Sequence, residues 1–254
     1  MNQLHFGCAT HIGLVRQRNE DSYGMDEQKK LWLVADGLGG HDAGDVASQI
    51  AVEQILNHVR TGEDLETAIT SAHSAILQAA DNGIGRPDMG TTAVALKIDG
   101  DAYEVAWVGD SRAYLWNGDS LIQVSRDHTV VQELVDQGFL PAQQLKNHPY
   151  SNILNRTLGV TSDRSPQIER INGSLSGNEV FLLCSDGLTN ELDDDVIHAV
   201  LSGPGDEQEK VDQLVELALS SGGSDNITAI LVNTTSSFRA DTLPNRPYKE
   251  PAGE

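Results

Sequence analysis

Residues 91–124 have the sequence TTAVALKIDGDAYEVAWVGDSRAYLWNGDSLIQV, which carries the strongest signal for the fold class. Apolar side chains alternate with polar or small ones around two short turns, the period of a β-strand with one buried face. Asp-Gly and Asn-Gly at these turns are type I′ hairpin signals. The stretch therefore predicts an antiparallel sheet and argues against an all-parallel doubly wound fold. The predicted strands are Thr91–Ile98, Tyr103–Val108, Arg112–Trp116 and Leu121–Val124.

Strands and amphipathic helices on both sides of the hairpins predict one α+β domain over residues 1–235. Polar, irregular Phe139–Pro166 is long for a plain connection and is typical of a functional flap. Residues 236–254 hold three prolines without periodicity and are predicted to be a disordered tail. The further predicted strands are Leu4–His11, Leu31–Ala35, Gln167–Ile171, Val180–Ser185 and Ile227–Val232, and the helices are Gly44–Arg60, Glu63–Asp81, Thr129–Gln137, Asp193–Leu201 and Glu207–Leu219.

The chain of 254 residues is strongly acidic, with 38 Asp and Glu against 17 Lys and Arg and a net charge of −21. Such a surface repels nucleic acid and anionic lipid and suits a basic partner or divalent cations, although it also fits a merely self-repelling, soluble surface. No apolar run approaches the ~20 residues that span a bilayer, and residues 1–10 do not resemble a secretory signal. Cys8 and Cys184 lie in apolar runs, which indicates buried, inert thiols. We therefore expect a cytoplasmic protein that binds neither nucleic acid nor membrane.

Four aspartates stand at the ends of predicted strands: Asp36, Asp110 and Asp186 follow strands, and Asp225 precedes the last one. Side chains at one edge of a sheet can meet, and converging carboxylates repel one another unless they are protonated or bridged by cations. Oxygen ligands without a set of His or Cys favour Mg²⁺ or Mn²⁺ over structural zinc. A single Asp-Gly is more simply a turn. Four such aspartates, one of them before the glycine-rich loop Gly37–Gly40, favour a metal site.

Other catalytic motifs do not occur in the sequence. A cysteine phosphatase needs Cys-x5-Arg, but Leu14 and Asn190 stand at the arginine positions relative to the two cysteines. The sequence contains neither Gly-x4-Gly-Lys-[Ser/Thr], nor His-Glu-x-x-His, nor Gly-x-Ser-x-Gly. The aspartates therefore remain as the reactive group, and they could hold two metals about 3.5–4 Å apart that activate a water.

Short blocks rich in Asp, Gly and Arg follow one another along the chain: Arg16–Asp21, Val34–His41, Gly90–Thr92, Gly109–Arg112, Asp127-His128, Ser185–Leu188 and Asp225–Thr228. In this order they resemble the motifs of the metal-dependent protein serine/threonine phosphatases (PPM, or type 2C), in the bacterial single-domain form. Each block is weak alone, but the series is specific and covers about Leu4 to Val232. The resemblance implies a four-layer α-β-β-α sandwich of two antiparallel sheets flanked by helices, with the metals at one end.

The resemblance also implies a phosphoprotein phosphatase, a hydrolase of phosphate monoesters that uses a metal-activated water and forms no phospho-enzyme. Its cofactor would be Mn²⁺ or Mg²⁺, as two core ions and a third, weaker one. Asp36 would bridge the core ions, and the backbone carbonyl of Gly37 would bind the second. Asp186 and Asp225 would complete the first core ion, and Asp110 would bind the third together with Asp186.

The remaining polar residues of the motifs receive roles from the same resemblance. Glu20 and Asp21 would hold waters on the metals, and Arg16 would bind the substrate phosphate. His41 would act as a general acid, since histidine changes charge near neutral pH; a loop histidine without a role is the alternative. His128 is expected to be structural.

Two positions depart from the family pattern, Leu38 in place of Met and Asp45 in place of Glu, and neither removes a ligand. The implied partners are phosphorylated proteins and a cognate serine/threonine kinase whose signalling the enzyme reverses, and the enzyme itself is expected to be a monomer. Two alternatives stay open. One is a phosphatase of a small phosphate ester. The other is a phosphatase-like regulatory binding module, whose mark would be a missing ligand.

Overall fold

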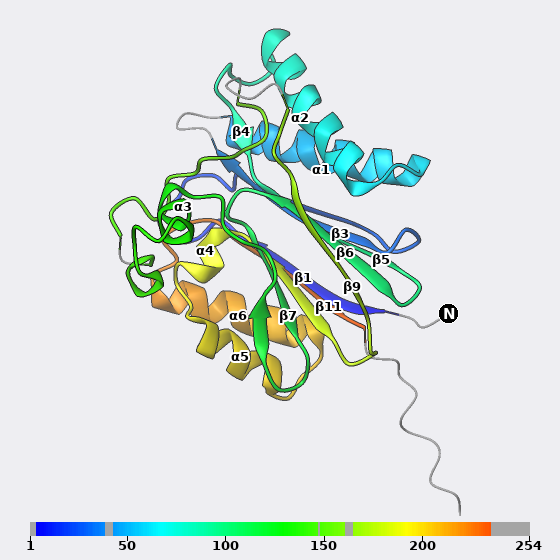
Figure 1. Cartoon of the computed structure of the whole chain (residues 1–254), viewed down its shortest axis with the longest axis vertical. Coiled ribbons are helices and arrows are strands. Elements are labelled where there is room, and N and C mark those ends of the chain that lie inside the picture. Colours follow the sequence, from blue (N-terminus) through cyan, green and yellow to red (C-terminus); the bar gives the residue numbers. More distant parts are fainter. Residues whose placement is uncertain (1–3, 39–42, 147, 161–164, 235–254) are drawn as a thin grey trace, which may run out of the picture.

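The computed structural model describes residues 4–38, 43–146, 148–160 and 165–234. Two antiparallel sheets pack face to face, and helices cover their outer faces (Figure 1). The predicted α-β-β-α sandwich is thereby confirmed. No helix in this part of the chain is long and apolar enough to cross a membrane. The predicted tail over residues 236–254 lies outside the described residues.

Each sheet takes one of the two predicted hairpins, so the chain crosses between the sheets after the first hairpin, at Gly109–Ser111. All paired strands run antiparallel. One sheet has the order β1 (His5–His11), β11 (Ile227–Asn233), β10 (Val180–Cys184), β7 (Arg112–Trp116) and β8 (Leu121–Gln123). The other has the order β2 (Asp21–Asp26), β3 (Leu31–Leu38), β5 (Ala93–Asp99), β6 (Ala102–Val108) and β9 (Glu169–Ser174), and β4 (Gly90–Thr91) pairs with the end of β3.

The longer helices form the two outer layers of the sandwich (Figure 1). α1 (Gly44–Thr61) and α2 (Leu65–Asp81) cover the sheet that contains β3, and α5 (Asp194–Ser202) and α6 (Glu207–Ser221) cover the sheet that contains β10. Shorter helical segments are α3 (Val130–Asp136), η1 (Ala142–Gln144) and α4 (Asp186–Thr189).

The first five residues of β3, Leu31–Ala35, are all apolar because this part of the strand has a packed layer on each face. Leu31, Leu33 and Ala35 belong to the core under α1 and α2, whereas Trp32 and Val34 belong to the core between the two sheets. A strand that is buried on both faces has no position left for a polar side chain, so it shows no alternation. The same packing buries the thiol of Cys184 in β10 and raises its pKa to about 12, which agrees with the predicted inert cysteine.

The helix starts follow from local capping. Asp64 accepts a hydrogen bond from the N–H of Thr67 (2.8 Å) at the start of α2. At the start of α6, Asp206 accepts from the N–H of Glu209 (2.9 Å), and the Glu209 side chain accepts from the N–H of Asp206 (3.0 Å). This reciprocal pair is a capping box, which satisfies backbone donors that the helix itself leaves unpaired.

Two details of the sequence prediction are wrong. The hairpin turns are not type I′, which requires positive φ at both central residues. Each turn has one glycine with positive φ, Gly100 or Gly118, but its second central residue does not have positive φ. In the described part of the chain, Lys30 is the only residue other than glycine with a positive φ. The sequence also did not predict strand β2, because Asp-Ser-Tyr-Gly-Met-Asp has no β-branched residue and a central Gly24. Pairing along β3 outweighs this weak local preference.

Candidate metal centre

The predicted ligands meet at one end of the two sheets. Asp36 lies near the end of β3, Asp110 lies in the crossover between β6 and β7, Asp186 begins α4 directly after β10, and Asp225 precedes β11. These elements come together around a cavity of about 250 Å³. Its lining is Arg16, Glu20, Asp36, Gly37, Leu38, Asp110, Asn152, Leu154, Asp186, Asp225 and Asn226.

Burial and mutual repulsion raise the pKa values of Asp36, Asp110 and Asp186 at this cavity. Burial is the largest cause of the strongly raised pKa of Asp36, followed by the charges of Asp21, Asp186, Asp110 and Asp225. Burial also raises the pKa values of Asp110 and Asp186, with Asp186 the next cause for Asp110 and Asp225 the next cause for Asp186. Carboxyl groups in this situation hold either protons or a cation.

Asp21 is the cross-strand partner of Asp36 and does not itself line the cavity. Ser185 Oγ donates to Asp21 Oδ2 (2.7 Å), whereas Oδ1 is buried and has no hydrogen-bond partner among the described residues. Burial raises the pKa of Asp21 to about 7, although hydrogen bonds from Thr228 and Ser185 act in the opposite direction. A buried carboxylate oxygen without a partner beside an acidic cavity fits a nearby cation or its water.

The donor set suits an open magnesium or manganese site rather than a closed cage. Within the described ranges, no three Asp, Glu, His or Cys side chains form a group that could hold a metal by themselves. Mg²⁺ characteristically keeps several waters and takes few carboxylates from the protein. Dispersed carboxylates around a cavity therefore fit this type of ion, and the described lining has carboxylate oxygens but no His or Cys.

Position 37 requires glycine because two other backbone segments lie against it. A Cβ there would stand 2.2 Å from the carbonyl oxygen of Gly44 and 2.6 Å from that of Glu20. The Gly37 N–H donates to the same Glu20 oxygen (3.1 Å). The main chain of Gly37 thus lines the cavity without a side chain in the way, which is compatible with its predicted role as a carbonyl ligand.

Arg16 lies at the rim of the cavity and is bonded to a predicted ligand. Its Nη2 donates to Asp225 Oδ2 at 2.5 Å, and about half of the side chain, 53%, is exposed. This hydrogen bond is the largest cause of the raised pKa of the guanidinium, and burial opposes it. Arg16 and a cation would therefore compete for Asp225. Binding of a phosphate through both Nη groups would require Nη2 to leave this carboxylate.

Asn226 is a site residue that the sequence analysis did not single out. Its Oδ1 accepts from the N–H of Glu20 (2.8 Å), and its Nδ2 donates to the carbonyl oxygens of Ile12 (2.9 Å) and Arg18 (2.8 Å). These three bonds hold the N-terminal segment of the site against the start of β11. The sequence could have indicated this residue, because it directly follows Asp225 inside one of the matching blocks.

The two histidines of the motifs have different outcomes. His41 lies outside the described residues, so its role as a general acid stays a prediction. His128 is buried, and its Nδ1 accepts from the N–H of Gly109 (3.1 Å). Burial, followed by the charge of Arg156, lowers the pKa of His128. A neutral ring that anchors the crossover between β6 and β7 agrees with the predicted structural role.

The sequence profile of the protein phosphatase 2C family matches residues 13–218. The chain belongs to this family. The matched range includes every predicted ligand of this phosphatase 2C family member except Asp225.

Relatives of this family member have names and folds that agree with the assignment. The chain is 36% identical over 242 residues to the serine/threonine phosphatase stp of Listeria innocua, covering 90% of this chain and 95% of the relative. A structure of the serine/threonine phosphatase PstP of Mycobacterium tuberculosis superposes with a TM-score of 0.83 at 33% identity, over 91% of this chain and 99% of that one. The catalytic domain of PstP in complex with two manganese ions gives a TM-score of 0.79 at 32% identity, over 91% and 97% of the two chains.

Proposed function

We propose that this member of the phosphatase 2C family is a Mn²⁺- or Mg²⁺-dependent hydrolase of phosphoserine and phosphothreonine in proteins. The observation that carries the proposal is the convergence of Asp36, Asp110, Asp186 and Asp225 on one cavity, where burial and mutual repulsion act on the carboxyl groups. The names of the relatives support the substrate class, and the related structure with two manganese ions supports the cofactor.

We assign the ligands as follows. Asp36 would hold both core ions, because it lines the cavity together with the other three predicted acidic ligands, whose charges, after burial, raise its pKa. The carbonyl of Gly37 serves one core ion, and Asp186 and Asp225 serve the other. Asp110 serves a third ion together with Asp186, since these two face both this cavity and a larger neighbouring one.

The ions, when bound, supply Lewis-acid activation of water and neutralise phosphate charge. Arg16, once released from Asp225, can donate two N–H bonds to phosphate oxygens, which fixes the orientation of the phosphoryl group as well as its position. Glu20, which lines the cavity, and Asp21, the buried cross-strand neighbour of Asp36, would accept hydrogen bonds from waters on the ions and hold them in place. His41 donates a proton to the leaving serine or threonine oxygen.

A protein substrate is favoured over a small phosphate ester by the larger cavity, of about 630 Å³, that adjoins the site. It offers space for residues next to the phosphorylated one. A binding module without catalysis would lack a ligand, and each predicted acidic ligand is present at the cavity. The enzyme would oppose a serine/threonine kinase, acting as a monomer in the cytoplasm.

The test is phosphate release from phosphoserine and phosphothreonine peptides and from p-nitrophenyl phosphate, first in EDTA and then with excess Mn²⁺ or Mg²⁺. We expect no turnover in EDTA, recovery with either metal, and a higher kcat/KM for the peptides. Turnover in EDTA would contradict the metal mechanism. Turnover of the small ester alone would contradict the protein substrate.

We also propose that residues 1–235 form the catalytic domain and that residues 236–254 are a separate tail. A chain that ends at residue 235 should keep the kcat and Tm of the full chain. A marked fall in either value would mean that the tail docks on the domain.

A further inference from the structure

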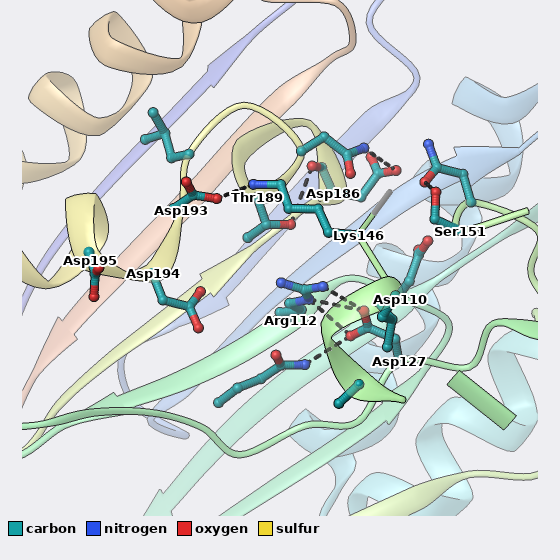
Figure 2. A pocket seen from close by; sticks show the side chains of 16 residues that line it. Asp110, Arg112, Asp127, Lys146, Ser151, Asp186, Thr189, Asp193, Asp194 and Asp195 are labelled. Atoms are coloured by element: carbon teal, nitrogen blue, oxygen red, sulfur yellow. Dashed lines mark hydrogen bonds and ion pairs between the residues drawn. The ribbon is translucent and has the colours of Figure 1, made fainter. Parts of the chain in front are cut away.

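The cavity of about 630 Å³ opens directly beside the metal centre. Asp110, Asn152 and Asp186 line both cavities, so a substrate held at one lies at the edge of the other. Figure 2 shows the aspartates at the start of α5 on one side of this larger cavity, Asp110 and Asp127 on the other, and Lys146 between them. The second cavity is therefore in reach of residues that flank a bound phosphoresidue.

The lining of this cavity has a surplus of negative charge. Among the described residues that line it, six aspartates face two cations, Arg112 and Lys146. The Arg112 guanidinium already has hydrogen-bond partners: Nε and Nη2 donate to the two oxygens of Asp127, and Nη1 donates to Tyr114 Oη (3.0 Å). Asp127 is thus paired with Arg112 and Asp193 with Lys146, so the described lining offers no cation to Asp194 and Asp195 at the start of α5 or to Asp110 and Asp186 at the metal centre.

This acidic wall already holds one ammonium group. Lys146 Nζ, from the predicted flap, donates to Asp193 Oδ1, although the two residues are 47 positions apart. Both side chains are exposed, at 52% and 73%. Exposed ion pairs contribute little stability, so an incoming cation can replace Lys146 easily. The pair shows which chemistry the wall accepts: a basic group on a flexible stem.

We propose that this cavity is a subsite for a lysine or arginine side chain of the substrate, close to the phosphorylated residue, and that Asp193 and Asp195 determine this preference. The inference rests on the proposed function. With the phosphate at the metal centre, the shared wall directs the neighbouring residues of the substrate to the larger cavity. The substrate's basic group then takes the place of Lys146 at the start of α5.

The test uses phosphothreonine peptides that differ only by lysine or alanine, with the lysine placed in turn at each neighbouring position. At the best position, we expect the lysine peptide to have a kcat/KM about three- to tenfold higher at low salt, with a smaller gain at high salt. In Asp193→Asn/Asp195→Asn this gain should disappear, while turnover of the alanine peptide and p-nitrophenyl phosphate stays unchanged. Asn remains a good N-cap residue at position 193, so α5 should be preserved.

Two variants provide matched controls. Lys146→Gln frees the wall and should increase the lysine gain about twofold to threefold. Asp99→Asn/Asp101→Asn removes the same charge at the exposed turn between β5 and β6 and should leave the gain intact. Thermal unfolding of each variant confirms that the fold is kept.

Several outcomes would overturn the subsite. The first is an undiminished lysine gain in Asp193→Asn/Asp195→Asn. The second is a loss of this gain in the Asp99/Asp101 control as large as in Asp193→Asn/Asp195→Asn. The third is that Asp193→Asn/Asp195→Asn binds fewer Mn²⁺ ions by calorimetry, which would make the cavity a cation site. Equal turnover of lysine and alanine peptides by the wild type would reject the subsite alone. A failure to hydrolyse any phosphopeptide would reject the proposed function itself.

Discussion

Two acidic regions lie side by side in this phosphatase 2C family member and are built in opposite ways. Around Asp127 the chain supplies its own counter-charge: Arg112 bonds both carboxylate oxygens at 2.7–3.1 Å, and Gln123 adds a further bond at 2.9 Å. Around Asp36 the neighbours are mainly other carboxyl groups. The cation at that rim, Arg16, is half exposed and bonds Asp225 alone among the ligands.

This difference separates charge that supports the fold from charge that serves a ligand. A buried ion pair with full hydrogen bonding is satisfied, and removing one partner leaves an uncompensated charge. Carboxyl groups that raise one another's pKa destabilise the protein until a proton or cation relieves them. Neutralising substitutions should therefore have opposite effects on stability in the two regions.

The largest effect is expected for Asp36→Asn. Because one carboxylate is assigned to both core ions, kcat/KM should fall by more than about a thousandfold, roughly 4 kcal/mol. In EDTA the variant should be at least as stable as the wild type, because a repelling charge is gone. Phosphate release and thermal unfolding measure the two effects. Full activity would rule out the bridging role.

Asp127→Ala should show the reverse pattern, a large loss of stability. It leaves the Arg112 guanidinium, whose side chain is only 21% exposed, without its counter-ion. We expect the free energy of unfolding to fall by about 2–4 kcal/mol in urea titrations, somewhat less than for a fully buried pair. Asp99→Ala, at an exposed turn, is the control and should change it by less than about 0.5 kcal/mol. If Asp127→Ala lowered the free energy of unfolding as little as Asp99→Ala, the distinction between the two regions would be wrong.

Arg16→Ala tests whether the rim cation serves the substrate or merely balances Asp225. Loss of a charge-assisted contact to phosphate should lower kcat/KM about tenfold to 150-fold, roughly 1.5–3 kcal/mol. KM should change more than kcat, because the ions hold the other side of the phosphate. Lysine should rescue only part of the loss. Mn²⁺ affinity should not fall, since Arg16 competes for Asp225. An unchanged kcat/KM would leave Arg16 as an ordinary surface residue.

The last test is the pH dependence of stability in the metal-free protein. Asp21 has a pKa of about 7 in the folded chain against 3.8 ordinarily, so the folded state keeps a proton that the unfolded state has released. Stability should therefore be higher near pH 5 and decrease as the pH rises through about 7. Tm measured across this range in EDTA should show the decrease, and Mn²⁺ should reduce it. A Tm in EDTA that rises with pH would contradict the raised pKa of the buried Asp21.

Much of the fold follows from short-range patterns. The alternation and turns of residues 91–124 predict both hairpins, and the apolar run Leu31–Ala35 predicts a strand, which forms the first part of β3. Asp206 and Glu209 mark the start of α6 through their own local bonds. β2 is the exception, because its residues acquire strand geometry only from pairing with β3. Local periodicity and capping depend on residues within a few positions of one another, which is why the sequence carries them directly.

The residues of the metal centre could also be named from the sequence, since each ligand belongs to a matching block at the end of a strand. Their contacts could not. Asp225 meets Arg16 across 209 positions, Asn226 ties the Glu20 segment across 206, and Lys146 reaches Asp193 across 47. Which carboxylate receives a counter-ion, and where a second cavity opens beside the first, depends on how separate layers pack. Contacts between residues so far apart in the sequence form only when the whole sandwich has assembled.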